Sequence, residues 1–214
     1  MIIKAVNYCA ADLDIVAAYG ELESHQQNPD YWSDKTLERL KSRVKDHYIE
    51  EQGVRCCYCN KHLNSKNHRV WDVEHIAPRA KHARFMFEPK NLAASCPDCN
   101  LSKGDKEVLV NPRRKTYPAD SKGFKIVHPH YDIYGQHISY KKFVYVPISE
   151  KGKFTIYTCD LLRFTVNFLG MKGSAADTSF EEEVDAAFNA KADPVLADLA
   201  IELIDLELSK NGLR

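Results

Sequence analysis

The spacing of apolar residues predicts a helix over residues 33–52, SDKTLERLKSRVKDHYIEEQ. Four apolar side chains recur in it at helical intervals: Leu37, Leu40, Val44 and Tyr48. Ser33 or Asp34 can cap the start of this helix, and Gly53 is suited to end it. We therefore expect an amphipathic helix immediately before a segment rich in cysteine.

Two short stretches in the cysteine-rich segment, residues 69–76 and 91–96, are expected to form strands joined by a loop. Residues 97–104 then predict a short helix, because proline is tolerated in a first turn and Gly104 is a good terminator. The predicted order is strand, loop, strand, helix.

The pattern changes after residue 105 to pieces rich in β-branched and aromatic residues, which are typical of strands. These pieces are FKIVHPHYDIY (124–134), KKFVYVPIS (141–149) and KFTIYT (153–158). Helices are expected at 158–170, 180–192 and 194–210. The last helix has apolar residues on more than one side, so it either packs within this chain or binds a partner.

The net charge is zero, from 30 basic and 30 acidic residues, but the charge is unevenly distributed. Residues 56–115 hold twelve Lys and Arg against six Asp and Glu, whereas residues 176–214 hold three against ten. A basic segment is expected where a protein binds a polyanion, although a solvated surface explains it equally well.

We expect three regions: a helical one at 1–54, a cysteine-rich module at 55–115, and a mixed α/β to helical one at 116–214 with acidic helices from residue 176. No run of eighteen apolar residues occurs, so no membrane partner is expected. The start, MIIKAVNYCAADLD, lacks the basic region and cleavage site of a signal peptide. We therefore expect a cytoplasmic protein.

Seven cysteines and no secretion signal argue against a disulfide framework. Four of them form two Cys-x-x-Cys pairs, separated by 36 residues: Cys56 with Cys59, and Cys96 with Cys99. Four thiolates suit Zn²⁺ and leave no open coordination position, so the predicted zinc site is structural. A redox role for one pair is the alternative. Cys57 is interpreted as a bystander, and Cys9 and Cys159 as small buried hydrophobic residues.

Between the two cysteine pairs lies VWDVEHIAPRA, residues 70–80, with an adjacent Glu74 and His75. Neighbours on a strand point to opposite faces, but Pro78 indicates that the strand ends here. One of the pair can then hold a metal while the other acts as a base. Asn100, directly after Cys99, can offer its amide oxygen to the same ion as Glu74. Oxygen ligands of this kind favour Mg²⁺ over zinc.

The string CYC…VEHIAP…NLAASCPDCNLSKGD resembles the HNH endonucleases of the ββα-metal fold, in the subgroup that has a four-cysteine zinc site. The resemblance covers about residues 56–106. It implies an α+β fold with a ββα-metal core stapled by zinc and flanked by N-terminal and C-terminal helices. It also implies that residues 55–115 are a nuclease module that hydrolyses phosphodiester bonds, with DNA as the expected substrate.

The resemblance assigns roles to individual residues. His75 matches the general base, and Asn91 the central asparagine that positions the base. Asn100 matches the last motif position, a metal ligand that is often His, and Glu74 an acidic ligand that is more often Asp. The implied catalytic ion is Mg²⁺ or Mn²⁺. For a lone histidine, a satisfied position in the core is the alternative.

Four basic residues are candidates for binding the nucleic-acid backbone: Arg79, Lys81, Arg84 and Lys103. Lys103 lies three residues after Asn100 on the same helical face, although a solvated lysine is the alternative. His82 falls in the same basic loop, and His62 and His68 are expected in solvent.

Residues 127–138, VHPHYDIYGQHI, contain His128, His130 and His137. They are a candidate metal or phosphate site, or turn and sheet structure. The segment resembles one in the nuclease subunit of Septu-type anti-phage systems and in a nuclease found beside some retrons. Those subunits work with an ATPase partner, which an acidic helical tail would suit. The competing interpretation is a zinc-stapled module that binds nucleic acid or a partner without catalysis.

Overall fold

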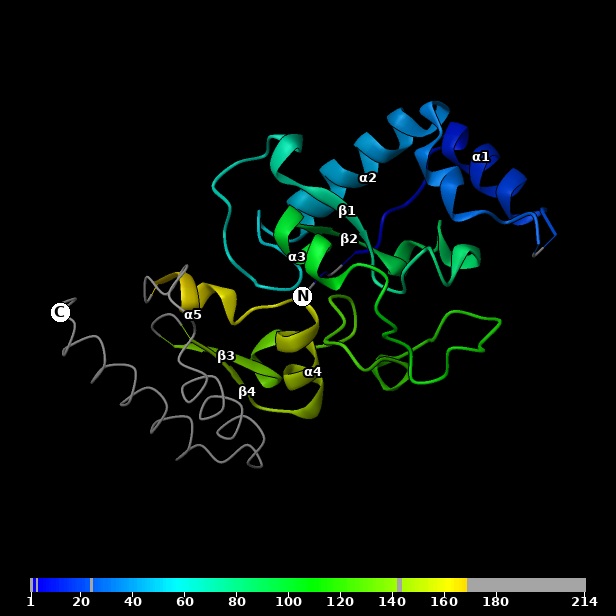
Figure 1. The fold of residues 1–214 in the computed structure, drawn as a ribbon. Helices are drawn as coiled ribbons and strands as arrows, with labels where there is room; N and C mark the ends of the chain where they lie inside the picture. Colours follow the sequence, from blue (N-terminus) through cyan, green and yellow to red (C-terminus); the bar gives the residue numbers. More distant parts are fainter. Residues whose placement is uncertain (1, 3, 24, 142–143, 169–214) are drawn as a thin grey trace, which may run out of the picture. The chain divides into compact units, whose positions relative to one another are not determined.

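The computed structural model describes residues 2, 4–23, 25–141 and 144–168 (Figure 1). The chain divides into two compact units, 1–133 and 134–214, so the N-terminal elements share a unit with the cysteine-rich module. The helices expected at 180–192 and 194–210 lie outside the described residues. Within the described part, no helix has the length and apolar character needed to cross a membrane.

The predicted amphipathic helix is α2 (Glu38–Glu51), and all four residues of its expected apolar row are buried. It begins later than predicted, because two 3₁₀ turns, Pro29–Ser33 and Lys35–Leu37, precede it. The Asp34 side chain caps the second turn by accepting a hydrogen bond from the Thr36 amide. Gly53 follows the helix with a φ of +58°, as a terminating glycine does.

Helix α1 (Ala10–Gly20) was not predicted, because it lacks an apolar stripe. Its buried residues are Asp12, which is paired with Arg43 of α2, and Tyr19, whose hydroxyl donates to the Ala83 carbonyl. Polar contacts to distant residues thus hold this helix. Cys9 stands at its N-cap and is exposed, so the expectation of a buried Cys9 is wrong.

The centre of the first unit is an antiparallel hairpin of β1 (Asp72–His75) and β2 (Leu92–Ser95), followed by α3 (Pro97–Lys103). The predicted order of strand, loop, strand and helix is confirmed. Both strands are shorter than expected, because their first residues belong to 3₁₀ turns. Helix α2 packs against both strands and α3 against β1 (Figure 1). These elements form the predicted α+β, ββα core.

Short 3₁₀ turns connect the remaining parts of the first unit: His68–Val70, Ala83–Phe85, Pro89–Asn91 and Ser121–Gly123. The strand expected at 124–134 is wrong. Phe124 makes one isolated bridge with Leu109, after which the chain turns. The Asp132 carboxylate accepts the His128 amide at 2.7 Å, so a side chain takes the place of a strand partner.

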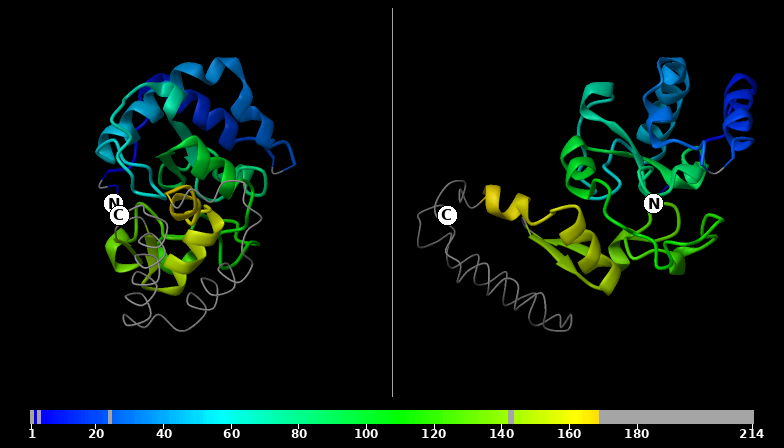
Figure 2. Two further views of the ribbon diagram at one scale, coloured as in Figure 1. Left: turned by 60° about the vertical axis from the view of Figure 1, so that its left-hand side comes forward. Right: turned by 45° about the vertical axis from the view of Figure 1, so that its right-hand side comes forward.

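The second unit contains a 3₁₀ turn (Tyr134–Gln136), the hairpin of β3 (Ile138–Lys141) and β4 (Val144–Pro147), α4 (Glu150–Thr158) and α5 (Arg163–Phe168). Helix α4 packs against β4 (Figure 2). The strand expected at 153–158 is wrong, since this stretch is helical. Ser149 caps α4 by accepting from the Gly152 amide, and this local bond starts the helix.

Candidate active site

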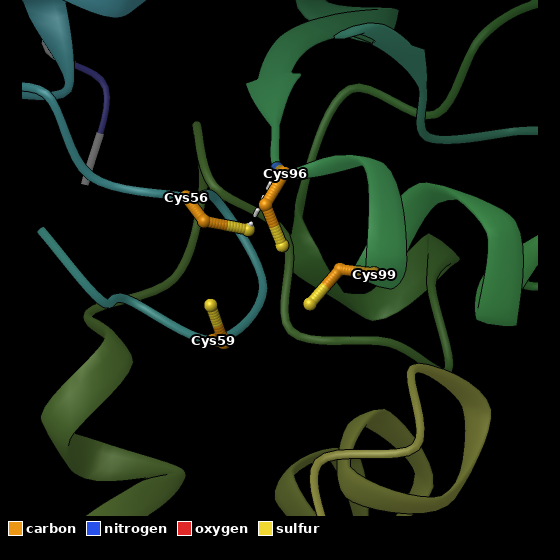
Figure 3. Close-up of side chains that lie close together, drawn as sticks. All are labelled: Cys56, Cys59, Cys96 and Cys99. Atoms are coloured by element: carbon orange, nitrogen blue, oxygen red, sulfur yellow. Dashed lines mark hydrogen bonds between the residues drawn. The ribbon is translucent and has the colours of Figure 1, made fainter. Parts of the chain in front are cut away.

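Four cysteine side chains converge where the chain enters and leaves the central hairpin (Figure 3). Their sulfur atoms all lie within 4.8 Å of one another and all four residues are buried. Cys56 and Cys59 come from the loop after α2, Cys96 from the end of β2, and Cys99 from α3. A tetrahedral ion with Zn–S bonds of about 2.3 Å fits such a group.

Local hydrogen bonds shape both halves of this cluster. In the first, the Cys56 amide donates to the Lys61 carbonyl at 3.1 Å, and Asn60 has a positive φ of 55° that tightens the turn. In the second, Cys96 is the N-cap of α3, and its amide donates to the Cys56 sulfur at 3.3 Å. Backbone donors aimed at a sulfur are expected around a thiolate ligand.

The four cysteine side chains lie so close together that their thiolate forms require a cation between them. Hydrogen bonding with Cys56 is the largest cause that raises the pKa of both the Cys59 and the Cys99 thiols. Four thiols packed this closely cannot all ionise without a positive charge between them. A divalent ion supplies that charge, so the donor set fits structural Zn²⁺.

Glu74 on β1 is a carboxylate of the candidate catalytic site and is only 2% exposed. Its Oε1 accepts a hydrogen bond from the Tyr58 hydroxyl at 2.9 Å and lies 2.5 Å from the Lys103 Nζ. Burial raises the pKa of the Glu74 carboxyl, whereas the Lys103 ammonium and the Tyr58 hydroxyl favour the ionised form. The carboxylate is thus held by groups from two other segments.

His75 follows Glu74, and its ring lies nearly perpendicular to the ring of Trp32, with ring centroids 4.6 Å apart. Its Nε2 lies 3.1 Å from the Met86 carbonyl oxygen. A carbonyl only accepts, so Nε2 carries the proton and Nδ1 retains its lone pair. Burial, followed by the nearby Arg79 and Lys103 charges, lowers the pKa of His75 to about 3. The imidazole is therefore neutral at pH 7.

Asn91 is fully buried and holds the loop between β1 and β2. Its Oδ1 accepts from the Ala77 amide at 2.7 Å, and its Nδ2 donates to the carbonyls of Ala77 and Phe85. The Ile76 amide donates to the Asn91 carbonyl at 2.8 Å. These bonds fix the backbone on both sides of the His75 ring.

A cavity of about 860 Å³ lies in the first unit, and Glu74, His75 and Asn100 all line it. Asn100 is half-buried on α3, and its Nδ2 donates to the Asp72 carboxylate at 2.9 Å. The three residues predicted around the catalytic ion are therefore brought to one cavity. Trp32 and Arg79 also line it, and Trp32 comes from outside the cysteine-rich module.

The four basic candidates differ in their surroundings. Lys81 and Arg84 are exposed, and Lys81 lies 3.9 Å from Asp105. Arg79 is half-buried and donates to the Pro29 carbonyl. Lys103 is only 1% exposed, and it also donates to the His75 carbonyl at 2.8 Å. It thus lies inside the fold and not on the surface.

The other histidines singled out in the sequence have partners within the fold. His82 is buried and its Nε2 lies 2.9 Å from the Glu107 carboxylate, so it is not part of an exposed basic loop. His62 is exposed as expected, and His68 is half-buried, 2.6 Å from Asp46. His128, His130 and His137 were candidates for a metal or phosphate site, or for turn and sheet structure. His128 bonds to Tyr117, His130 to the Leu92 carbonyl and His137 to Ser149, which favours the structural alternative.

The sequence did not indicate several residues of the site: Trp32, Tyr58, Asp72 and Met86. Tyr58 lies inside the CYC string, and its place between two zinc ligands was the available signal. Met86 contributes only a backbone carbonyl, which no side-chain pattern can reveal. Asp72 lies two residues before Glu74, on the same face of a strand, and that spacing could have indicated it.

Comparison with known proteins shows which family the cysteine-rich module resembles. Residues 56–106 match the family described as HNH endonuclease. The Septu protein PtuB of Bacillus thuringiensis is 30% identical over 76 residues, which are 34% of this chain and 29% of that protein. The chain thus spans less than a third of the length of the curated relative it matches. The match, the four-cysteine cluster and the ββα core together fit an HNH endonuclease segment of the zinc-binding type at residues 56–106.

Proposed function

We propose that the segment is the catalytic core of a metal-dependent endonuclease that hydrolyses phosphodiester bonds, with DNA as the substrate. His75 is the general base, and Glu74 and Asn100 hold a Mg²⁺- or Mn²⁺-type ion. The observation that carries the proposal is the hydrogen bond from His75 Nε2 to the Met86 carbonyl, which leaves Nδ1 unprotonated on a residue that lines the cavity with Glu74 and Asn100. A core histidine would also pair its N–H, so the place of His75 beside Glu74 and Asn100 on one cavity is what favours a base over packing.

The donor set supports a hard cation. Glu74 offers carboxylate oxygen, and Asn100 offers amide oxygen because its nitrogen is bonded to Asp72. Few protein ligands and room for water in the cavity suit Mg²⁺, which keeps several waters. When bound, such an ion would draw negative charge from the scissile phosphate and the leaving oxygen.

The base acts on water. A neutral imidazole can accept a proton at Nδ1 from water that attacks phosphorus, while Nε2 keeps its bond to the Met86 carbonyl. Burial without substrate holds the pKa of His75 at about 3. A phosphate anion in the cavity would raise that pKa, which brings the group nearer to the range of an effective base. Asn91 keeps the imidazole in place through the loop it holds.

The basic residues around the cavity bind the phosphate backbone of the substrate. Arg79 lines the cavity, and the exposed Lys81 and Arg84 extend the positive charge along the same loop. Phosphate contacts of this kind grip any sequence, so we expect little base specificity. Lys103 acts on Glu74 and not directly on phosphate, since it is buried against that carboxylate.

The biological role proposed is anti-phage defence, with cleavage directed by an ATPase partner in the cytoplasm. The similarity to a Septu protein supports it, although the match covers a third of this chain. The acidic segment from residue 176 is the part of the sequence proposed to dock such a partner.

The proposed function is tested with zinc-loaded protein against supercoiled plasmid, single-stranded DNA and RNA, each with Mg²⁺, Mn²⁺ or EDTA. We expect plasmid cleavage that requires the divalent ion and is lost in Glu74→Gln. Cleavage of RNA alone would correct the substrate. Binding of DNA without cleavage under every condition, with or without a partner ATPase, would favour a zinc-stapled binding module instead.

A further inference from the structure

Asp72 is a carboxylate of the cavity that lies outside the motif and that the proposed mechanism uses only as the hydrogen-bond partner of Asn100. It begins β1 two residues before Glu74, so the two side chains project from the same face of the strand. It is half-buried, lines the cavity, and accepts the hydrogen bond from Asn100 Nδ2 at 2.9 Å. The two partners are 28 residues apart, so the bond joins the first strand to α3.

This bond sets the direction of the Asn100 amide. An ionised carboxylate only accepts, so the amide must turn its nitrogen toward Asp72 and its oxygen away. Among the described residues, no group donates a hydrogen bond to that oxygen. The amide oxygen is therefore available to a cation. Without Asp72, a rotation of half a turn would present the NH₂ group to the ion instead.

The charge of Asp72 matters as well, because the charge of Glu74 is already matched. Glu74 lies 2.5 Å from the Lys103 ammonium, and both groups are almost fully buried. A divalent ion approaching this pair meets little net negative charge. Asp72 makes no such close ion pair in the described part of the chain, although the half-buried Lys45 lies close enough to feel its charge. It can thus supply the negative charge that attracts the ion.

We propose that Asp72 is a positioning residue for the catalytic cation, which aims the Asn100 oxygen at the ion and contributes its charge to the site. This inference rests on the proposed function, since it presumes a cation on Glu74 and Asn100. In this role Asp72 does not contact the substrate and takes no direct part in proton transfer.

The test is Mn²⁺ titration of the zinc-loaded full chain, followed by the electron paramagnetic resonance signal of free Mn²⁺. Asp72→Asn should weaken Mn²⁺ binding by about 10–100-fold, as loss of a residue that orients a metal ligand does. Asp98→Asn is the matched control, because Asp98 is an exposed carboxylate on α3, the helix of Asn100, and its replacement should leave the affinity unchanged. Zinc content and thermal unfolding of each variant establish that it is folded.

A reciprocal exchange tests whether restoring the bond and the charge together restores Mn²⁺ binding. Asp72→Asn combined with Asn100→Asp rebuilds a bond between an amide and a carboxylate and keeps the net charge. It should bind Mn²⁺ more tightly than Asp72→Asn alone. If Asp72→Asn does not fold, Asp72→Glu takes its place, since it keeps the charge but displaces the carboxylate, and it too should weaken binding.

Mn²⁺ affinity that is unchanged in Asp72→Asn overturns the inference, and so does a zinc-loaded wild-type chain that binds no Mn²⁺. The two proposals fail separately. Ion-dependent cleavage with unchanged Mn²⁺ affinity in Asp72→Asn leaves the nuclease standing and removes Asp72 from the site. If Mn²⁺ binding depends on Asp72 but the chain cleaves no nucleic acid, the role of Asp72 in cation binding stands and the nuclease activity is removed.

Discussion

Lys103 is a buried cation whose main contacts are Glu74 and the His75 carbonyl. Desolvating a charge is costly, and only a close partner of opposite charge offsets the cost. Glu74 is that partner at 2.5 Å, and the Tyr58 hydroxyl satisfies the same carboxylate oxygen. Burial raises the pKa of the Glu74 carboxyl, and the Lys103 ammonium and the Tyr58 hydroxyl oppose that rise by favouring the ionised form.

Replacing Lys103 with an uncharged residue leaves the buried Glu74 carboxylate without a counter-charge. We expect Lys103→Met to lower the free energy of unfolding by roughly 3–5 kcal/mol. Adding Glu74→Gln should recover most of that loss, because the unpaired charge is then gone. Urea unfolding at saturating zinc measures both, with Lys66→Met as the control at an exposed lysine. A Lys103→Met variant as stable as wild type would show that the two groups are not an ion pair.

At the scale of elements, the loop between β1 and β2 depends on one side chain. Asn91 bonds to the Ala77 amide and carbonyl and to the Phe85 carbonyl, all of which face the protein interior. These backbone groups have few alternatives, and a buried polar group left unpaired costs about 1–3 kcal/mol. The loop carries Met86, whose carbonyl orients His75.

Asn91→Ala should therefore disturb the catalytic site through the loop. We expect the Ala77 amide to exchange its hydrogen much faster than in wild type, together with a fall in the free energy of unfolding of about 3 kcal/mol. Hydrogen exchange measured by NMR gives the first quantity, and urea unfolding gives the second. Exchange at Val146, which pairs with Ser139 in the β3–β4 hairpin, serves as the internal reference. Unchanged protection at Ala77 would contradict this role for Asn91.

His130 ties the segment after residue 124 to β2, since its Nε2 donates to the Leu92 carbonyl at 2.8 Å. Burial lowers the pKa of His130 from 6.5 to about 4. The folded state therefore binds fewer protons than the unfolded state between these values. The stability linked to His130 is complete above pH 6.5 and is lost as the pH falls toward 4.

His130→Gln removes this titration but can keep a donor for the Leu92 carbonyl. Between pH 7 and pH 5, wild type should lose about 2 kcal/mol more stability than the variant. Urea unfolding at a series of pH values, with zinc present throughout, measures the difference between the two proteins. Parallel curves would show that His130 does not titrate differently on folding.

At the scale of the whole molecule, the zinc site joins the loop after α2 to the end of the hairpin and the start of α3. Zinc binding to such a site is coupled to folding. Both tryptophans of the chain, Trp32 and Trp71, lie in the first unit. Trp71 is 1% exposed, so tryptophan fluorescence reports on the fold of this unit.

Cys96→Ser should lose zinc and unfold the first unit, seen as a red shift of tryptophan emission. Cys57→Ser is the matched control, because Cys57 neighbours a ligand but is not among the four converging sulfurs. It should retain one zinc per chain with unchanged emission. A folded Cys96→Ser protein without zinc would contradict the structural role of the metal.

The sequence predicted the central module well and its surroundings less well, for physical reasons. The order of elements in the core follows from short-range patterns and from cysteines with fixed spacing. Helix α1 has no apolar stripe, and its buried Asp12 depends on Arg43 of another helix. The stretch KFTIYT fits strand and helix equally, and the cap at Ser149 decides between them.

Some residues of the candidate site could be predicted from the sequence, and others could not. Glu74, His75, Asn91 and Asn100 were proposed from motif positions, and the fold brings three of them to one cavity. Trp32 approaches His75 from 43 residues away, and no spacing rule connects them. The buried position of Lys103 was also not predictable, because it depends on a carboxylate that reaches it only in the folded chain.

The central claim is that His75 is the base of a metal-dependent nuclease. Its most direct test compares wild type and His75→Ala in single-turnover cleavage of supercoiled plasmid with Mn²⁺, using zinc-loaded protein and any partner that wild type requires. Wild type should cleave, and His75→Ala should be slower by about 10²–10⁴-fold while it keeps its zinc and its Mn²⁺ affinity. Equal rates for the two proteins would contradict the account.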